Sequence, residues 1–282
     1  MEANQPSLTA HGAALHRAAH QIVDVPQVFA DPLALRIIGP EAEAEIRAGR
    51  ERHAQKGASR LRAFLAVRSR YTEDCFAQAA NQGVGQYVVL GAGLDTFAYR
   101  APRPGLRIFE VDHPATQGWK RERLKSAAIP IPETLSYAPV DFERETLDDG
   151  LTRAGFDFAK PAFFAWLGVV PYLTRDAIMA TLGFVARRLK PRSEILFDYA
   201  EPMEGRGVAN AQALAELSKR VALIGEPLRS FFTPDEWQRD LHALGFSTVE
   251  DMNAQALNAR YFSQREDGLA LGEAAHIMRA RV

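Results

Sequence analysis

The sequence contains very little cysteine and no excess of charge of either sign. Its 282 residues include one cysteine, Cys75, which excludes an intramolecular disulfide and favours a reducing compartment. The 34 lysine and arginine residues are balanced by 35 aspartate and glutamate residues, so the chain lacks the basic excess of a nucleic-acid-binding protein. We therefore expect no nucleic-acid partner and no polybasic contact with a membrane surface.

Long apolar runs are absent as well. The longest run, residues 161–173, is too short to span a bilayer and is predicted to be buried in the core. Residues 1–6 carry neither a basic segment nor an apolar stretch, so they do not resemble a signal peptide and we expect a cytoplasmic protein. Hydrophobic residues make up 47% of the chain, which is enough for the full core of a globular protein.

Metal-ligating patterns are also scarce. His11, His16 and His20 recur four or five residues apart on a predicted helix, but no cysteine or carboxylate lies between them. This arrangement favours a partly exposed helix face over a metal site. We therefore expect that the chemistry of this protein is independent of a metal ion.

One segment of the chain carries two predicted strands and a glycine-rich turn. Residues 86–90 form a short apolar run that is typical of a buried strand, and the run ends at the turn 91–93. A second apolar run, residues 106–111, ends at Asp112, which follows Gly93 by 19 residues. A strand, a glycine turn, a short helix and a second strand with a terminal carboxylate are typical of a nucleotide-binding βαβ unit. In such units the carboxylate meets the ribose hydroxyls.

The glycine turn favours a nucleoside that carries no phosphates. A dinucleotide fingerprint needs a third glycine, and Thr96 stands at that position. Asp95 would repel a diphosphate, and no lysine or arginine lies in residues 91–99 to offset it. S-adenosylmethionine fits these constraints, because it has a ribose, a sulfonium and an amino-acid end. The alternatives are a turn that binds no ligand and the cofactor of an NAD(P)-dependent oxidoreductase, which the missing glycine disfavours.

Six motifs occur in the order in which one known family has them. Two of them are Leu90-Gly-Ala-Gly-Leu-Asp-Thr-Phe-Ala-Tyr-Arg100 and Phe109-Glu-Val-Asp-His-Pro114 with Lys120. The others lie at residues 67–76, 140–142, 165–174 and 257–265. Together they resemble the leucine carboxyl methyltransferase-like family of S-adenosylmethionine-dependent methyltransferases, and in particular its bacterial small-molecule O-methyltransferases of the tetracenomycin type. The resemblance runs from about Phe29 to the C-terminus.

The resemblance implies the α/β fold of the class I methyltransferases. That fold is a Rossmann-like, mostly parallel sheet with an antiparallel terminal hairpin, and seven predicted strands fit it. The implied domains are an N-terminal helical cap (1–80) and a methyltransferase core (81–282) with an insertion that forms a lid (201–232). We expect residues 1–11 to be loosely attached. The motif at 257–265 is expected to form a loop near the substrate or to tie the last hairpin to the core.

The resemblance also implies where the cofactor binds. On the strongest predicted helix, residues 59–80, Arg68 matches the arginine that pairs with the methionine carboxylate, and Arg70 is the second choice. Asp141 and Phe142 end the third strand, where such residues contact adenine, although Asp141 is also placed to cap a following helix. The implied cofactor site comprises Arg68, Gly91, Ala92, Gly93, Asp112, His113, Asp141, Phe142 and Leu167.

Leu167 departs from the family pattern. Relatives commonly have a glutamate at this position, and that glutamate meets the amino end of the cofactor. Its absence leaves the ammonium group to backbone carbonyl groups near Gly91 or to another carboxylate. The departure bears on cofactor affinity rather than on the fold, and it is the one feature that favours a protein that binds the cofactor without catalysis.

The activity that the resemblance implies is methyl transfer to oxygen. The donor is already activated, so the protein mainly has to place the acceptor behind the methyl group. A carboxylate acceptor needs no general base, whereas a hydroxyl needs one nearby. Tyr172 and Tyr199, near the carboxyl ends of predicted strands, are the candidate catalytic residues, and Asp198 is a further candidate base. We expect a small-molecule acceptor; the alternative is the C-terminus of a protein. The sequence does not indicate an oligomeric state.

Overall fold

The computed structural model describes residues 7–51, 55–100, 103–141, 144–202, 215–216, 218–219, 221–223 and 225–282. Its strands are β1 (Gln86–Leu90), β2 (Arg107–Asp112), β3 (Leu135–Pro139), β4 (Phe163–Trp166), β5 (Glu194–Tyr199), β6 (Thr248–Asn253) and β7 (His276–Arg281). The longer helices are α1 (Leu8–Val23), α3 (Pro40–Ala48), α5 (Lys56–Asn81), α7 (Pro114–Ser126), α9 (Arg175–Arg188), α11 (Pro234–Leu244) and α12 (Ala254–Tyr261). The shorter ones are α2 (Ala34–Ile38), α6 (Phe97–Arg100), α8 (Leu147–Arg153) and the 3₁₀ turn η1 (Val170–Tyr172).

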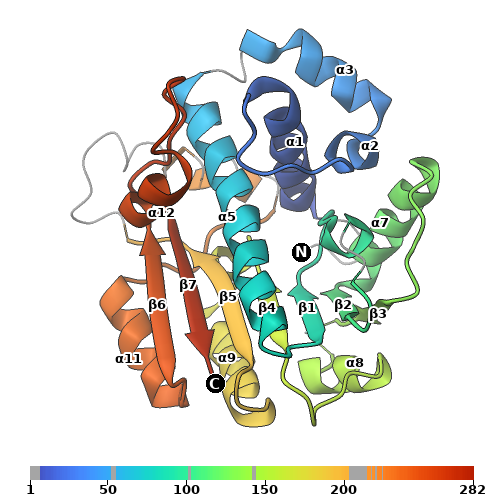
Figure 1. Cartoon of the computed structure of the whole chain (residues 1–282), viewed down its shortest axis with the longest axis vertical. Helices are drawn as coiled ribbons and strands as arrows, with labels where there is room; N and C mark the ends of the chain where they lie inside the picture. The colour runs from blue at the N-terminus through green and yellow to red at the C-terminus, as the bar shows by residue number, and fades with distance from the viewer. Residues whose placement is uncertain are drawn as a thin grey trace.

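The strands form one sheet in the order β3-β2-β1-β4-β5-β7-β6. The first five are parallel, and β7 lies antiparallel between β5 and β6, so the predicted mostly parallel sheet with an antiparallel terminal hairpin is confirmed. The strand order reverses between β1 and β4, which are direct neighbours. Ligands of open α/β sheets bind outside the carboxyl ends of the strands at such a reversal. The topology therefore directs attention to the carboxyl ends of β1 and β4 (Figure 1).

Apolar side chains cover both faces of the sheet. Helix α5 runs along one face (Figure 1), where Ala63, Val67 and Tyr71 share a buried cluster with Tyr87 and Phe163 of the strands. Helices α8, α9 and α11 supply the cluster on the other face. Its members with no exposed surface include Leu151, Ile178, Leu182, Trp237 and Leu241. Because the parallel strands are buried on both faces, their carboxyl ends are held in fixed relative positions.

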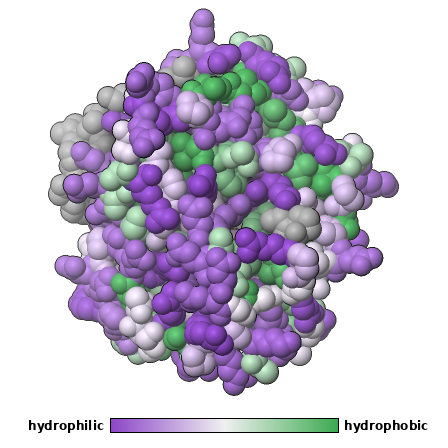
Figure 2. Space-filling model, viewed as in Figure 1, coloured by the Kyte–Doolittle hydropathy of each residue, from purple (hydrophilic) through white to green (hydrophobic). Residues whose placement is uncertain are grey.

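The outer surface is largely polar. Figure 2 shows hydrophilic residues over most of the face viewed in Figure 1, with hydrophobic residues in scattered groups. Among the described residues, the large apolar side chains that are exposed are Leu8, Val25, Ile131 and Leu223. Within the same residues, no helix combines the length and the apolar character that crossing a bilayer requires.

The N-terminal helices α1, α2 and α3 lie at the end of the sheet where the parallel strands finish (Figure 1). Helix α1 begins at Leu8, behind an N-cap in which the Ser7 hydroxyl accepts a hydrogen bond from the backbone N–H of Ala10. The expectation that residues 1–11 are loosely attached is therefore wrong from Leu8 onward. The division into cap and core stays a prediction, and residues 203–214 of the expected lid lie outside the described residues.

The family motif near the C-terminus is helical over its first half. Helix α12 begins behind Asn253 as its N-cap, so the expectation of a loop is wrong there. Leu257 is fully buried, and the Tyr261 hydroxyl donates to Asp74 of α5 at 2.8 Å. The alternative expectation, that the motif ties the last hairpin to the core, agrees with these contacts. The polar residues of the motif favoured a loop in the sequence, because the contact of Leu257 and Tyr261 with the core depends on the position of α5.

A buried charge cluster ties α1 to α5. His20 has no exposed surface, and its Nε2 accepts hydrogen bonds from the backbone N–H groups of Val28 and Phe29. Its Nδ1 therefore carries the proton and donates to Asp24 at 2.7 Å. Arg62 of α5 donates to both oxygens of the same carboxylate, at 2.6 and 2.7 Å. The expectation of an exposed histidine face is wrong for His20, which is part of this cluster.

The Asp24 cluster predicts a loss of stability in acid. Burial acts to raise the pKa of Asp24, but hydrogen bonds from Arg62 and His20 outweigh it and lower this pKa from 3.8 to about 2. A carboxyl group with a depressed folded-state pKa contributes stability above its unfolded-state pKa. We expect a contribution of about 2 kcal/mol above pH ~4, lost as the pH falls from about 4 to about 2.

Urea unfolding of the wild type and of Asp24→Asn from pH 6 to pH 2 measures this contribution. The variant should be less stable by about 2 kcal/mol at pH 6 and should change less with acid than the wild type does. Asp240→Asn, which removes a surface ion pair with Arg175, is the matched control and should follow the wild type. Parallel pH curves for Asp24→Asn and the wild type would contradict the assignment.

Candidate functional site

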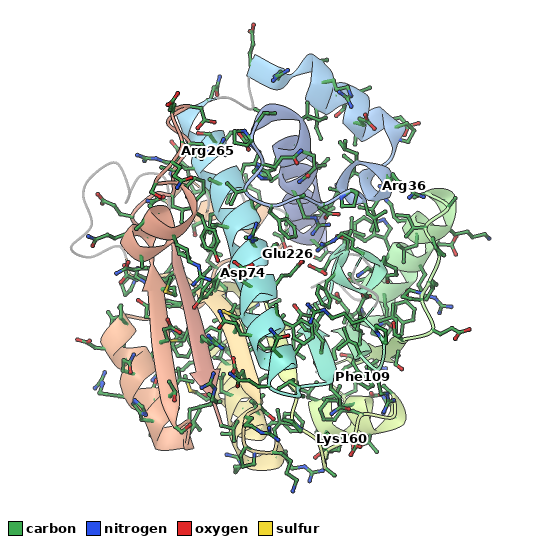
Figure 3. All side chains as sticks on the ribbon, in the orientation of Figure 1. Arg36, Asp74, Phe109, Lys160, Glu226 and Arg265 are labelled. Carbon is green, nitrogen blue, oxygen red and sulfur yellow. The ribbon has the colours of Figure 1, made fainter. Side chains whose placement is uncertain are left out.

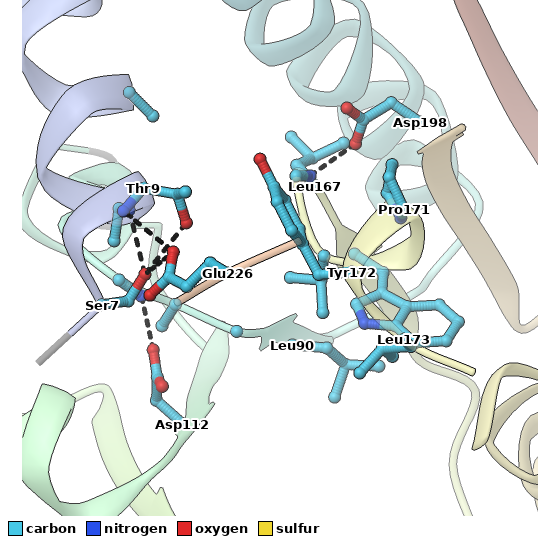
Figure 4. Close-up of a pocket in the computed structure, with 18 of the residues that line it drawn as sticks. Ser7, Thr9, Leu90, Asp112, Leu167, Pro171, Tyr172, Leu173, Asp198 and Glu226 are labelled. Atoms are coloured by element: carbon cyan, nitrogen blue, oxygen red, sulfur yellow. Dashed lines mark hydrogen bonds between the residues drawn. The ribbon is translucent and has the colours of Figure 1, made fainter. Parts of the chain in front are cut away.

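A large cavity lies at the carboxyl ends of β1, β4 and β5. Its volume is about 1750 Å³. The walls come from the start of α1, the turn 91–95 after β1, α5, the loop 167–173 after β4 and the segment 225–229. Figure 4 shows how side chains from these segments converge on the cavity. Sites for one small molecule usually measure about 300–1,000 Å³, so this cavity has room for two ligands side by side.

The turn after β1 is shaped by two glycines at which a side chain would be strained and crowded. Gly91 has a φ of +67°, and a Cβ atom there would lie 2.4 Å from Cγ2 of Val169 in the loop after β4. Gly93 has a φ of +43°, and its Cβ atom would lie 3.0 Å from Cβ of Ala10 in α1. Ala92 between them is buried and lines the cavity. The bare backbone therefore lets the β4 loop and α1 close on the turn from two sides.

The Asp112 side chain is hydrogen-bonded to the backbone of this turn. Its carboxylate accepts hydrogen bonds from the backbone N–H groups of Gly93, at 2.6 Å, and His113, at 2.7 Å (Figure 4). Burial raises the pKa of Asp112, and the two backbone hydrogen bonds oppose this shift. Two oxygens offer about four acceptor positions, so two remain for ribose hydroxyls. His113 lines the cavity too, and its Nδ1 caps α7 by accepting from the N–H of Ala115 at 3.2 Å.

Asp141 lies at another side of the cavity, beyond the end of β3. Helix α8 starts later, at Leu147, where Thr146 caps it together with Asp149, so the adenine role and the cap role of the Asp141 side chain both stay predictions. The backbone carbonyl of Asp141 accepts from the N–H groups of Arg144 and Glu145, at 2.8 Å each. Phe142, expected beside adenine, lies outside the described residues.

Three elements meet at an ion pair in the cavity wall. Arg68 of α5 donates from Nη1 to Asp198 at the end of β5, over 2.8 Å. The other oxygen of Asp198 accepts from the backbone N–H of Gly168 at 2.5 Å. Gly168 has a φ of +71°, and a Cβ atom there would lie 2.9 Å from Nη2 of Arg68. Leu167 lines the cavity beside this pair and packs against the core cluster under α5. Arg70, the second choice, instead pairs with Asp74 on the outer side of α5.

Glu226 closes the cavity on the side of α1, and sequence reasoning missed it. Its carboxylate accepts from the Ser7 hydroxyl at 3.3 Å and from the backbone N–H groups of Leu8 and Thr9 at 3.2 and 3.0 Å. These N–H groups belong to the first turn of α1, where a negative charge is stabilised by the helix dipole. Figure 3 shows Glu226 in the middle of the molecule, below α1. No local pattern links two segments so far apart in the chain.

Comparison with known proteins bears on the family. Residues 10–186 match the family model for leucine carboxyl methyltransferase. The protein YktD of Bacillus subtilis strain 168, provisionally named an S-adenosyl-L-methionine-dependent methyltransferase, is 32% identical over 99% of this chain and 99% of its own. The chain belongs to the leucine carboxyl methyltransferase family.

Other relatives of this methyltransferase agree with the assignment. A protein of Mycobacterium bovis strain BCG with a similar provisional name is 35% identical over 64% of this chain and 60% of its own. The crystal structure of a Thermobifida fusca protein that is provisionally named a methyltransferase superposes with a TM-score of 0.57 at 19% identity, over 99% of this chain and 96% of that chain. At that identity, the structural likeness supports the fold alone.

S-adenosylmethionine is the cofactor of this methyltransferase, and the residues of the cavity fit it. The turn 91–93 leaves backbone free for a nucleoside, Asp112 offers acceptors to ribose hydroxyls, and the turn has no basic side chain of the kind that a diphosphate needs. The family assignment replaces the alternative of an NAD(P)-dependent oxidoreductase. The individual roles of the nine implied cofactor residues stay predictions.

Both candidate catalytic tyrosines line the cavity, but their hydroxyl groups differ in surroundings. Tyr172 in η1 lines the cavity, and its hydroxyl points toward Thr9 and Glu226 (Figure 4). Burial raises the pKa of Tyr172 against the opposing charge of Arg68, so its hydroxyl is protonated at neutral pH and can donate a hydrogen bond. Tyr199 is 3% exposed, and its hydroxyl donates to Asp251 at 3.1 Å, in the terminal hairpin. The catalytic role of either tyrosine stays a prediction.

Gly91→Ala tests whether the close approach at the turn builds the cofactor site. Gly83→Ala is the matched control, because Gly83 has a φ of +91° but nothing within 4 Å of a Cβ atom. The left-handed backbone alone should lower the free energy of unfolding of Gly83→Ala by about 1–2 kcal/mol. Gly91→Ala should lose about 3 kcal/mol, because displacement of Val169 adds to the backbone strain.

Calorimetric titration with S-adenosylhomocysteine completes this comparison. Its affinity should be unchanged in Gly83→Ala and weaker by tenfold or more in folded Gly91→Ala. Equal affinity in the two variants would show that the turn does not shape the cofactor site.

Proposed function

We propose that this methyltransferase acts on an oxygen atom, a carboxyl or a hydroxyl, of a small and largely apolar molecule. The observation that carries the proposal is the cavity of about 1750 Å³, which exceeds the space that the cofactor needs. The wall next to Arg68 and Asp198 is mostly apolar or aromatic. Its members are Leu61, Phe64, Leu65, Val169, Pro171, Tyr172, Leu173 and Leu228. Such a wall favours a flat or apolar acceptor that a few polar groups orient.

The chain contributes binding and orientation to the reaction. Bound S-adenosylmethionine supplies an activated methyl group on a sulfonium. The side chains of α5 and of the β4 loop hold the acceptor, and the protonated hydroxyl of Tyr172 donates a hydrogen bond to orient it. The segments around Thr9 and Glu226 exclude water from one side of the site. A carboxylate acceptor is ionised at neutral pH, so orientation suffices and no general base is needed.

The C-terminus of a protein is the second candidate acceptor, since the family is named for carboxyl methylation of leucine. A protein tail needs an open groove, and the contacts of Glu226 with the first turn of α1 close this side of the cavity. The near-balanced charge of 34 basic and 35 acidic residues offers no complement to a charged tail. These features favour the small molecule. The third candidate is cofactor binding without catalysis, in which no methyl group is transferred to any acceptor.

Incubation of the protein with methyl-labelled S-adenosylmethionine and a cell extract distinguishes the three candidates. We expect the label in the small-molecule fraction, in an apolar product. Treatment with base should release the label if the product is a methyl ester and should leave it in place if the product is a methyl ether. Label in a protein band, released by base as methanol, would instead identify a protein carboxylate as the acceptor. If the protein binds the cofactor but transfers label to neither fraction, the result contradicts methyl transfer to an acceptor in that extract and supports cofactor binding without catalysis. Heat-denatured protein is the control.

A further inference from the structure

The ion pair of Arg68 and Asp198 has the charges of an amino acid's two ends. The guanidinium and the carboxylate are 2.8 Å apart, and their side chains are 13% and 6% exposed. Both line the cavity. They come from α5 and β5, 130 residues apart in the chain, so the fold brings them together at this point. A pair buried to this degree loses most of its hydration, which further bonds to a ligand would replace.

Each partner keeps hydrogen-bonding capacity. Asp198 accepts one bond from Arg68 and one from Gly168, which leaves about two of its four acceptor positions. Arg68 has five N–H donors, and within the described part of the chain its guanidinium makes the one hydrogen bond to Asp198. Contact with Gly168 fixes the plane of the guanidinium, since its nitrogens pack where a Cβ atom would stand. The pair is therefore held in a fixed orientation and still has hydrogen-bond donors and acceptors available for a ligand.

The pair lies across the glycine turn from the predicted ribose carboxylate. Gly91 touches Val169, and Val169 follows Gly168, which carries the ion pair. Asp112 bonds to the other side of the same turn, at Gly93. Figure 4 shows Asp112 and Asp198 on opposite sides of Leu90. A nucleoside on Asp112 that extends across the turn would bring its substituent to the ion pair.

The other carboxylates near the turn are engaged elsewhere. Asp95 accepts from the N–H of Phe97 at the start of α6. Glu226 accepts from the first turn of α1. Leu167, the neighbour of Gly168, carries no charge. Asp198 is thus the carboxylate that combines a position beside Arg68 with free acceptor capacity.

We infer that Asp198 binds the α-ammonium group of the cofactor, in place of the glutamate that the chain lacks at Leu167, beside the α-carboxylate that the family resemblance implies on Arg68. The pair of Arg68 and Asp198 has no net charge, and neither has the amino-acid end of the cofactor. In the complex the ligand carboxylate pairs with Arg68 and the ligand ammonium with Asp198, so no buried charge is left unpaired. A guanidinium suits the carboxylate because both are planar and can bond through two N–H groups. The inference rests on the methyltransferase activity but not on the identity of the acceptor.

Two ligands isolate this contact. S-adenosylhomocysteine has the amino-acid end, whereas 5′-methylthioadenosine has the same nucleoside without it. By calorimetry, Asp198→Asn should bind S-adenosylhomocysteine about 10- to 100-fold more weakly than the wild type, because a hydrogen bond to a charged group is lost. The affinity for 5′-methylthioadenosine should stay within twofold. Asp240→Asn, which also removes one aspartate charge from an ion pair, should bind both ligands as the wild type does.

A second change tests the position of the ammonium group. Adding Leu167→Glu to Asp198→Asn returns a carboxylate next to Gly168, so the double variant should regain affinity for S-adenosylhomocysteine alone. A double variant that stays as weak as Asp198→Asn would contradict this placement. Where Asp198→Asn does not fold, Asp198→Ser with the same two ligands takes its place and should show the same selective loss.

Failure of the inference differs from failure of the enzyme assignment. A folded Asp198→Asn protein that binds S-adenosylhomocysteine as tightly as the wild type would overturn the inference. An equal loss for both ligands would also overturn it, because that pattern indicates a general distortion of the site. A wild-type protein that binds neither ligand would overturn the cofactor assignment and the inference with it.

Discussion

The close approach of the loops that follow β1 and β4 is the constraint on which the site depends. Gly91 leaves no side chain between them, and Val169 fills the space that a Cβ atom would take. This contact fixes the distance between the turn on one side of the strand reversal and the loop on the other. Asp112 and the pair of Arg68 and Asp198 are attached to these two loops, so their separation is set by the same contact.

Charges at the cavity are satisfied locally before any ligand arrives. Asp112 bonds to two backbone N–H groups, Asp198 to Arg68 and Gly168, and Glu226 to the first turn of α1. Fixed donors and acceptors need no rearrangement when a ligand binds, which favours affinity and orientation. The apolar wall on α5 and the β4 loop leaves the remaining space to an acceptor with few polar groups.

The parts that depend on local sequence could be predicted, whereas the long-range contacts could not. The seven strands, the glycine turn and the acidic end of β2 follow from short apolar runs and turn residues, and each appears in the structure. The pairing of Arg68 with Asp198 and of Glu226 with Thr9 joins residues 130 and 217 positions apart, for which one sequence carries no signal. Helix α12 was missed for the same reason, because its hydrogen bond to Asp74 depends on α5, which lies far away in the chain.

The central claim is that one nucleoside spans the glycine turn from Asp112 to the ion pair. A crystal structure of the protein with bound S-adenosylhomocysteine tests it most directly. The account predicts ribose hydroxyls on Asp112, the carboxylate of the ligand on Arg68 and its ammonium group on Asp198. A ligand that lies away from residues 91–93, or whose amino-acid end points away from Arg68 and Asp198, would contradict the account.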